Sequence, residues 1–191
     1  MSRDAGRVEI RDAGFDDVRE IQRVARISWD HTYRETIPDS VRRKFVSQAY
    51  SADSLRYRTE SNVFLVAATD EEVLGFADFR QLSEIAVELA AIYMLPEMQG
   101  RGIGARLLEA GVGRFPPRTE FVLRVEQDNT RARRFYEAHG FRHAGDHAEE
   151  VCGHVIHEVE MILRLPEFKE SNNQVTGSNK LLEHLPKPFN R

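Results

Sequence analysis

The chain has 191 residues, of which 41% are hydrophobic and 30% are charged. This length suits one globular domain, and no apolar run approaches the roughly eighteen residues that cross a bilayer. The single cysteine, Cys152, excludes an internal disulfide framework and a thiolate-rich zinc site, and a net charge of −4 argues against a general nucleic-acid binder. The N-terminus does not resemble a secretory signal, so we expect a cytoplasmic protein without membrane association.

The composition changes near Pro166. Three of the four lysines and four of the six asparagines follow this position, although 23 of the 27 basic residues in the chain are arginines. This shift predicts a domain of residues 1–166, followed by residues 167–191 as a flexible tail or a remnant of an expression vector.

Apolar periodicity predicts that strands and helices alternate along the domain. The expected strands cover residues 8–11, 63–68, 73–80, 87–95, 121–125, 141 onward and 155–163. The expected helices cover residues 16–29, 102–115 and 129–139, with one more that begins at residues 38–39. Asp16 or Asp17 would cap the first helix and Asn129 the last.

A glycine-rich segment, residues 99–104, follows an expected strand and precedes an expected helix. Its glycines allow a tight turn and a close approach of the backbone to a ligand. The unpaired amides of the following helix turn make such a segment a cradle for pyrophosphate, to which Arg101 and Arg106 could add contacts. The spacing matches neither a dinucleotide-binding fingerprint nor the phosphate loop of nucleotide hydrolases, and a plain strand-to-helix turn is the simpler alternative.

A second motif covers residues 129–141, where Asn129 caps a helix that Gly140 ends. Together the two segments resemble the general-control-related N-acetyltransferase (GNAT) superfamily. Gln99, Gly102 and Gly104 fill that family's pyrophosphate motif, and the later block contains its asparagine, its alanine and its aromatic-Tyr-Glu sequence. The element order of the family covers residues 7 to 165.

The resemblance implies a mixed α/β fold, with a mostly antiparallel sheet of about seven strands flanked by helices. The sheet would open into a V between the strands at residues 87–95 and 121–125, and acetyl-CoA would enter there. No metal is expected. The residues that the resemblance assigns to acetyl-CoA are Ile92, Tyr93, Met94, Gln99, Gly100, Arg101, Gly102, Ile103, Gly104, Ala105, Asn129 and Arg133. For Arg133 and its neighbour Arg134, a solvated helix face is an equal alternative.

Two residues are candidates for catalysis. The resemblance implies that Tyr136 protonates the departing CoA thiolate, and the alternative is a core tyrosine with a satisfied hydroxyl. Glu88 resembles the glutamate that many family members use, through water, to take the amine proton. A solvent-facing strand carboxylate is the alternative reading of Glu88.

The sequence indicates the residues that bind the acceptor less clearly than those that bind acetyl-CoA. Trp29 and Tyr33 stand four residues apart on a helix and could line the acceptor pocket, although packing between helices explains Trp29 as well. Asp30 and Glu35 could attract a cationic amine. The spacing of His143, His147, His154 and His157 with Cys152 matches no established metal-ligand pattern, and Cys152 does not look like a nucleophile.

These features predict an N-acetyltransferase that moves an acetyl group from acetyl-CoA to a primary amine by direct transfer in a ternary complex. The acceptor is a small-molecule amine or a protein amine, and the resemblance is compatible with a homodimer. An acyl-CoA-binding regulatory module without turnover is the alternative, favoured less because Tyr136 and Glu88 are both present. An RNA-associated role for the arginines from Arg131 to Arg142 ranks last.

Overall fold

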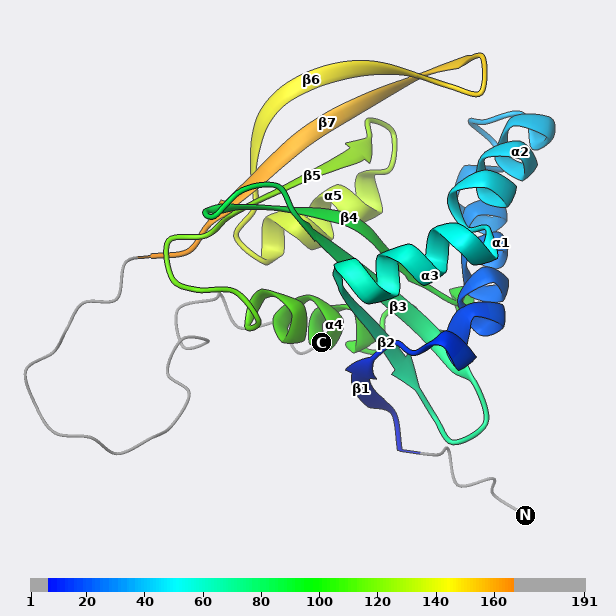
Figure 1. Ribbon diagram of the computed structural model, residues 1–191. Coiled ribbons are helices and arrows are strands. Elements are labelled where there is room, and N and C mark those ends of the chain that lie inside the picture. The colour runs from blue at the N-terminus through cyan, green and yellow to red at the C-terminus, as the bar shows by residue number, and fades with distance from the viewer. Residues whose placement is uncertain (1–6, 167–191) are drawn as a thin grey trace, which may run out of the picture.

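The computed structural model describes residues 7–166, so the predicted tail of residues 167–191 lies outside the described residues (Figure 1). The seven strands of its sheet are β1 (Glu9–Asp12), β2 (Val63–Ala68), β3 (Val73–Gln81), β4 (Ala86–Met94), β5 (Glu120–Glu126), β6 (Arg142–Val151) and β7 (His154–Arg164). The helices are α1 (Val18–Tyr33), α2 (Asp39–Ala49), α3 (Ala52–Ser61), α4 (Ile103–Val112) and α5 (Thr130–Ala138), with short 3₁₀ turns η1 (Phe15–Asp17) and η2 (Pro96–Met98).

The sheet has the order β1-β2-β3-β4-β5-β7-β6, and every neighbouring pair is antiparallel except β4 and β5. Helices α1 to α3 lie on one face, and α4 and α5 lie on the other (Figure 1). Two side chains of β3 illustrate these layers: Phe76 packs on Tyr50 at the end of α2, whereas Phe79 contacts Phe115 just after α4. The predicted mixed, mostly antiparallel fold is confirmed.

The predicted opening of the sheet is present between β4 and β5. These strands pair only where Ala86–Glu88 meets Glu120–Val122, so the remainder of β4 pairs with β3 alone. β5 then pairs along its whole length with β7. The two halves of the sheet therefore separate beyond Glu88, and the backbone groups of β4 that face the gap have no strand partner.

A β-bulge interrupts β4 at the opening. Asp78 of β3 pairs with Ala91 and Phe79 pairs with Leu89, which leaves Ala90 as an extra residue. The Asp78 carboxylate is 1% exposed and is held by Arg58 Nε at 2.8 Å and Asn62 Nδ2 at 2.7 Å, both from the α3 region. This buried ion pair anchors β3 at the position where the bulge begins.

One helix was not expected, and two expected helices end at other residues. Helix α3 was not predicted, because its sequence is largely polar and Leu55 is its one buried hydrophobic residue; the Ser51 hydroxyl caps it by accepting from Ser54 N. Helix α1 continues to Tyr33, and α4 ends at Val112 because Gly113 follows.

The cap of α1 also differs in its chemistry. Asp17 is the N-cap residue but makes no side-chain cap, because its carboxylate accepts from Arg11 and from the Gly14 amide.

Candidate active site

The glycine-rich segment forms an open turn at the end of β4. Gly100 and Gly102 have φ values of +79° and +77°, and a Cβ atom at either position would meet no atom within 4 Å. Gly102 is the N-cap of α4, so the first amides of that helix face the same open space. Glycine is needed here for its backbone conformation, and the turn leaves room for an anionic group beside the helix N-terminus.

The other predicted phosphate contacts divide into two groups. Arg101 is exposed and forms no ion pair or hydrogen bond with another side chain among residues 7–166, whereas Arg106 Nη2 donates to the Val8 carbonyl at 2.9 Å. A Cβ atom at Gly104 would lie 2.8 Å from Met94 Cε and 3.6 Å from Phe135 Cζ. We expected space for the pyrophosphate at Gly104, but this glycine allows α4 to pack closely on β4.

The start of α5 is shaped by Asn129 and Arg133. The Asn129 side chain accepts from Ala132 N at 3.1 Å and caps the helix as predicted. Arg133 Nη1 donates to the Gln127 carbonyl at 3.2 Å, and its buried Nε has no hydrogen-bond partner in the described part of the chain. Both side chains therefore hold the β5–α5 turn in place.

Tyr136 lies on the inward face of α5 with 8% of its surface exposed. Its ring packs against Phe135 and Phe141 at centroid distances of 5.3 and 5.6 Å. Burial raises the pKa of the Tyr136 hydroxyl well above its ordinary value, so the group keeps its proton at neutral pH. Within residues 7–166 no hydrogen bond to this hydroxyl is found, whereas buried tyrosine hydroxyls usually have a partner.

Two more tyrosines approach the same place from the other face of the sheet. Tyr93 of β4 and Tyr33 at the end of α1 are both largely buried, and burial raises the pKa of each hydroxyl. The proximity of Tyr136 raises the pKa of both hydroxyls further. The gap between β4 and β5 thus brings together side chains from α1, β4 and α5.

Glu88 occupies the point where β4 and β5 separate. Its carboxylate forms an ion pair with Arg80 Nη2 at 2.6 Å and is 29% exposed. Glu88 pairs with Arg80 and Tyr93 with Phe76, so the bulge at Ala90 brings these two β4 residues, five apart, onto the same face. Glu88 therefore lies on the α1–α3 side of the opening.

Trp29 is 6% exposed and packs on Phe45 and Tyr33 at centroid distances of 4.3 and 4.6 Å. Its role in packing α1 against α2 is therefore evident. Tyr33 is 9% exposed, and the negative charge of Glu126 on β5 adds to the effect of burial in raising the Tyr33 pKa. Asp30 forms ion pairs with Arg34 and Arg42.

Sequence reasoning missed a group of carboxylates across the opening. Glu126 of β5 and Glu158 of β7 are directly paired across the sheet, and burial raises the pKa of both. The negative charge of Glu149 on β6 raises the pKa of Glu158 further. Beside them lies a cavity of about 420 Å³ that the α1–α2 connection, including Thr36 and Ile37, helps to enclose. Only the strand pairing reveals this group.

Over residues 7–166 no group of three His, Cys, Asp or Glu side chains is arranged to hold a metal ion. None of the described helices has the length and apolar character needed to cross a membrane. Cys152 and Gly153, with φ values of +53° and +85°, form the turn between β6 and β7.

A mostly antiparallel sheet that opens beside a glycine cradle at a helix N-terminus defines a class of acyltransferase folds. The acetyltransferase (GNAT) family model matches residues 19–141. An uncharacterized N-acetyltransferase of Archaeoglobus fulgidus is 33% identical over 143 residues, which are 71% of this chain and 93% of that protein. The spermidine N(1)-acetyltransferase of Thermoplasma acidophilum is 29% identical over 143 residues, which are 71% and 88% of the two chains.

The fold is also found in solved structures. The PaiA N-acetyltransferase of Thermoplasma acidophilum, in complex with coenzyme A, superposes with a TM-score of 0.69 at 24% sequence identity, covering 83% of this chain and 99% of that chain. The present chain belongs to the GNAT family of acetyltransferases.

Proposed function

We propose that this acetyltransferase uses acetyl-CoA as donor and a primary amine as acceptor, and that both bind before the acetyl group moves directly between them. The observation that carries this proposal is the free inner edge of β4, which leads straight to the open turn at Gly100 and Gly102. An extended pantetheine arm fits such an edge in the way that an added strand does. Acetyl-CoA would supply the activated thioester.

The residues present fit that donor. The open space at Gly100 and Gly102 suits a pyrophosphate, Arg101 is placed to add a charge-assisted contact, and the backbone of Ile92 to Met94 borders the gap. Cys152 lies at the β6–β7 turn, where its thiol donates to Gln48 Oε1 on α2 at 3.7 Å. This position supports transfer without a covalent acyl-enzyme.

Tyr136 is proposed as the general acid. In the reaction the amine nitrogen bonds to the acetyl carbon, the carbon–sulfur bond breaks, and the sulfur leaves with the bonding electron pair as a thiolate. A protonated hydroxyl without a protein partner is suited to give that thiolate its proton. The nearby Tyr33 and Tyr93 hydroxyls would help to return a proton to Tyr136 after each turnover.

Glu88 is proposed to accept, through water, the proton that the amine loses. It lies where the two halves of the sheet separate and on the face opposite α4, the side from which the acceptor would approach. Its ion pair with Arg80 Nη2, at 2.6 Å, holds the carboxylate in place at the edge of the opening.

The acceptor is proposed to be a cationic amine, such as a polyamine. Glu126 and Glu158 lie on this side of the opening, and their raised pKa values reflect burial of charge that a bound ammonium group would relieve. The relative from Thermoplasma acidophilum that carries the name spermidine N(1)-acetyltransferase supports this choice.

The test is release of the CoA thiol from acetyl-CoA over a panel of amines that includes spermidine, amino acids and peptides with free N-termini or lysines. We expect turnover that is fastest with polyamines and that decreases with added salt. Tight acetyl-CoA binding without turnover on any amine would instead favour a regulatory module. The predicted homodimer and cytoplasmic location are separate proposals, and light scattering measures the first.

A further inference from the structure

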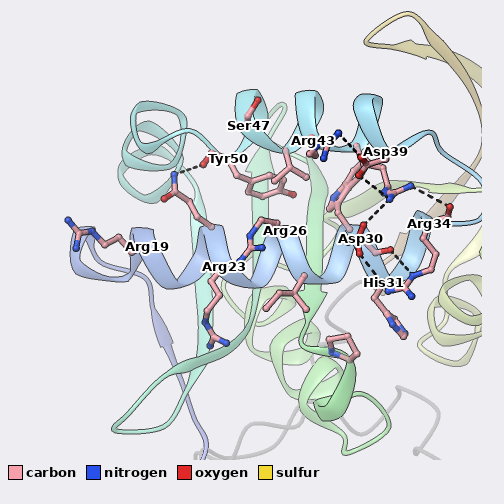
Figure 2. Close-up of a pocket in the computed structure, with 16 residues that line it drawn as sticks. Arg19, Arg23, Arg26, Asp30, His31, Arg34, Asp39, Arg43, Ser47 and Tyr50 are labelled. Carbon is pink, nitrogen blue, oxygen red and sulfur yellow. Dashed lines mark hydrogen bonds and ion pairs between the residues drawn. The ribbon is translucent and has the colours of Figure 1, made fainter.

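A second cavity lies away from the glycine cradle, although Trp29 and Asp30 of the predicted acceptor side border it. It is a groove of about 940 Å³ between α1 and α2, which we call the α1–α2 groove (Figure 2). The basic residues that line it are Arg19, Arg23, Arg26, Arg34, Arg42 and Arg43, against which stand Asp30 and Asp39. Six arginines against two aspartates give this groove a positive charge on a chain whose net charge is −4.

Only part of this positive charge is neutralised within the protein. Asp30 is shared by Arg34 and Arg42, and Asp39 is shared by Arg42 and Arg43. Three arginines thus divide two carboxylates between them.

The charge is least compensated along α1. Arg19, Arg23 and Arg26 recur at helical spacing on one face of the helix. Arg23 is paired with Glu20 and Glu72, but Arg19 and Arg26 are exposed and form no ion pair within residues 7–166. Figure 2 shows Arg26 on α1, Ser47 and Arg43 across the groove on α2, and Arg19 near the start of α1.

The floor of the groove is apolar. Ile27 and Val46 are half-buried there, while Trp29 and Tyr50 are 6% and 5% exposed. The aromatic rings are therefore covered and offer no face on which a nucleobase could stack, which is the usual way in which single-stranded nucleic acid is held. Carboxylate side chains that alternate with apolar ones would match both the arginine rim and this floor.

We propose that the α1–α2 groove binds an acidic, extended segment of a partner protein. The volume lies at the upper end of the range for small-ligand sites, and arginine rims recognise carboxylates with paired hydrogen bonds. The groove reaches Pro96 at the end of β4, but its charge is opposite to that of the Glu126 and Glu158 side of the molecule. It is therefore a surface for a partner rather than an extension of the acceptor pocket.

The test uses the full-length protein with CoA at saturation, so that the glycine cradle is occupied. A fluorescein-labelled short peptide of alternating glutamate and leucine is titrated by anisotropy, beside a lysine–leucine peptide and an oligouridylate RNA. We expect the acidic peptide to bind most tightly and its affinity to decrease with salt. Tighter binding of the RNA, or no binding of the acidic peptide, would overturn the proposal.

Reversing the charge of arginines in the α1–α2 groove tests whether the acidic peptide binds there. The double variant Arg19→Glu/Arg26→Glu should weaken peptide binding about tenfold, because each exposed ion pair contributes a few-fold. Arg142→Glu is the matched control, since this exposed arginine on β6 lies outside the groove. Equal affinity of the parent and the double variant, at unchanged melting temperature, would refute the site. Turnover on small amines should be the same in all three proteins, which separates this result from the proposed acetyl transfer.

Discussion

The two sides of the β4–β5 opening are built on different principles. On the donor side the important groups are backbone groups: the free edge of β4, the positive-φ turn at Gly100 and Gly102, and the first amides of α4. On the acceptor side they are side chains from distant segments, such as Tyr33, Glu126 and Glu158.

Because a backbone geometry demands particular residues at fixed spacing, the donor side leaves a motif in the sequence. The acceptor side leaves a weaker signal: Tyr33 was expected there from the sequence, but Glu126 and Glu158 come together only after the sheet has formed. A donor shared by a family and an acceptor that differs between its members would produce this asymmetry. Substitutions on each side test whether the donor side determines CoA affinity and the acceptor side determines turnover.

The largest effect is expected for Tyr136→Phe, which removes only the hydroxyl at the junction of the two sides. If this hydroxyl protonates the thiolate, turnover should fall roughly a hundredfold or more, because a general acid is lost. CoA affinity and melting temperature should barely change, since no described residue bonds to the hydroxyl. Turnover, calorimetric CoA affinity and thermal unfolding would be measured on one preparation.

Tyr50→Phe serves as a control for Tyr136→Phe. Tyr50 is equally buried, but its ring packs on Phe76 and Tyr93 at centroid distances of 5.8 and 6.4 Å, on the α1–α3 face of the sheet rather than on α5. We expect it to affect stability and to leave turnover intact. A destabilised but fully active Tyr136→Phe enzyme would assign Tyr136 to the structural core and leave the donor site untouched.

A smaller effect is expected on the donor side alone, for Gly102→Ala. The new Cβ would enter the open space beside the α4 N-terminus, and the backbone at φ +77° would become strained by about 1 kcal/mol. CoA affinity should decrease about tenfold in a folded protein, because the Cβ atom occupies space that the pyrophosphate would need; a tenfold loss corresponds to about 1.4 kcal/mol of binding free energy. Calorimetric titration with CoA measures it.

Gly153→Ala is the matched control for Gly102→Ala. Gly153 has φ +85°, and a Cβ atom there would also meet no atom within 4 Å, yet this glycine lies in the β6–β7 turn. It should show the same strain with unchanged CoA affinity. Gly104→Val is a poorer test, because its side chain would strike Met94 and disturb the packing of α4. Similar CoA affinities for Gly102→Ala and the parent would contradict the cradle.

Local patterns predicted most of the helices and strands and the cap at Asn129, because these depend on apolar periodicity and on residues with special backbone properties. The opening between β4 and β5 was implied by the resemblance to the family instead. The sequence did not predict α3, whose stability comes from Leu55 in the core and from the buried Arg58–Asp78 pair rather than from an apolar stripe.

The sequence also did not predict that Glu126 pairs with Glu158. The residue pattern of β5 or of β7 taken alone does not determine which residues of the two strands lie opposite each other. The roles predicted for Gly104 and Arg106 in phosphate binding stay predictions for a related reason. Both residues lie next to the cradle in sequence, but in the structure they contact Met94 and Val8.

An effect of similar size is expected on the acceptor side for Glu88→Gln. If Glu88 takes the amine proton through water, turnover should fall about tenfold and mostly at the lower end of the active pH range, where the free amine is scarcest. CoA affinity should not change. Arg80→Gln is the control, because it breaks the 2.6 Å ion pair but keeps the carboxylate. Superimposable pH–rate profiles for Glu88→Gln and the parent would mean that Glu88 only supports the sheet.

The smallest effects are expected for two carboxylates, Asp17 and Glu158, and they concern the stability of the protein rather than its catalysis. The pKa of Asp17 is lowered by its hydrogen bonds from Arg11 and Gly14, so its ionisation contributes stability above the unfolded-state pKa, and this is lost as the pH falls through the folded-state value. Asp17→Asn should therefore destabilise the protein by about 1 kcal/mol at neutral pH, and by less in acid.

Glu158 should behave in the opposite way. Burial and the charge of Glu149 raise its pKa, so the folded protein holds this proton more tightly than the unfolded chain does. The resulting stability is fully present below the unfolded-state pKa and is lost as the pH rises through the folded-state value.

The substitution Glu158→Gln mimics the protonated form of Glu158 at every pH. It should stabilise the protein at about pH 7 by a few tenths of a kcal/mol, since solvent screens a half-exposed group, and should have no effect at about pH 4. Urea unfolding of both variants at the two pH values measures this. If Glu158→Gln destabilises the protein at neutral pH, as Asp17→Asn does, the ionised Glu158 stabilises the fold. The negative charge on the acceptor side would then carry no cost in stability.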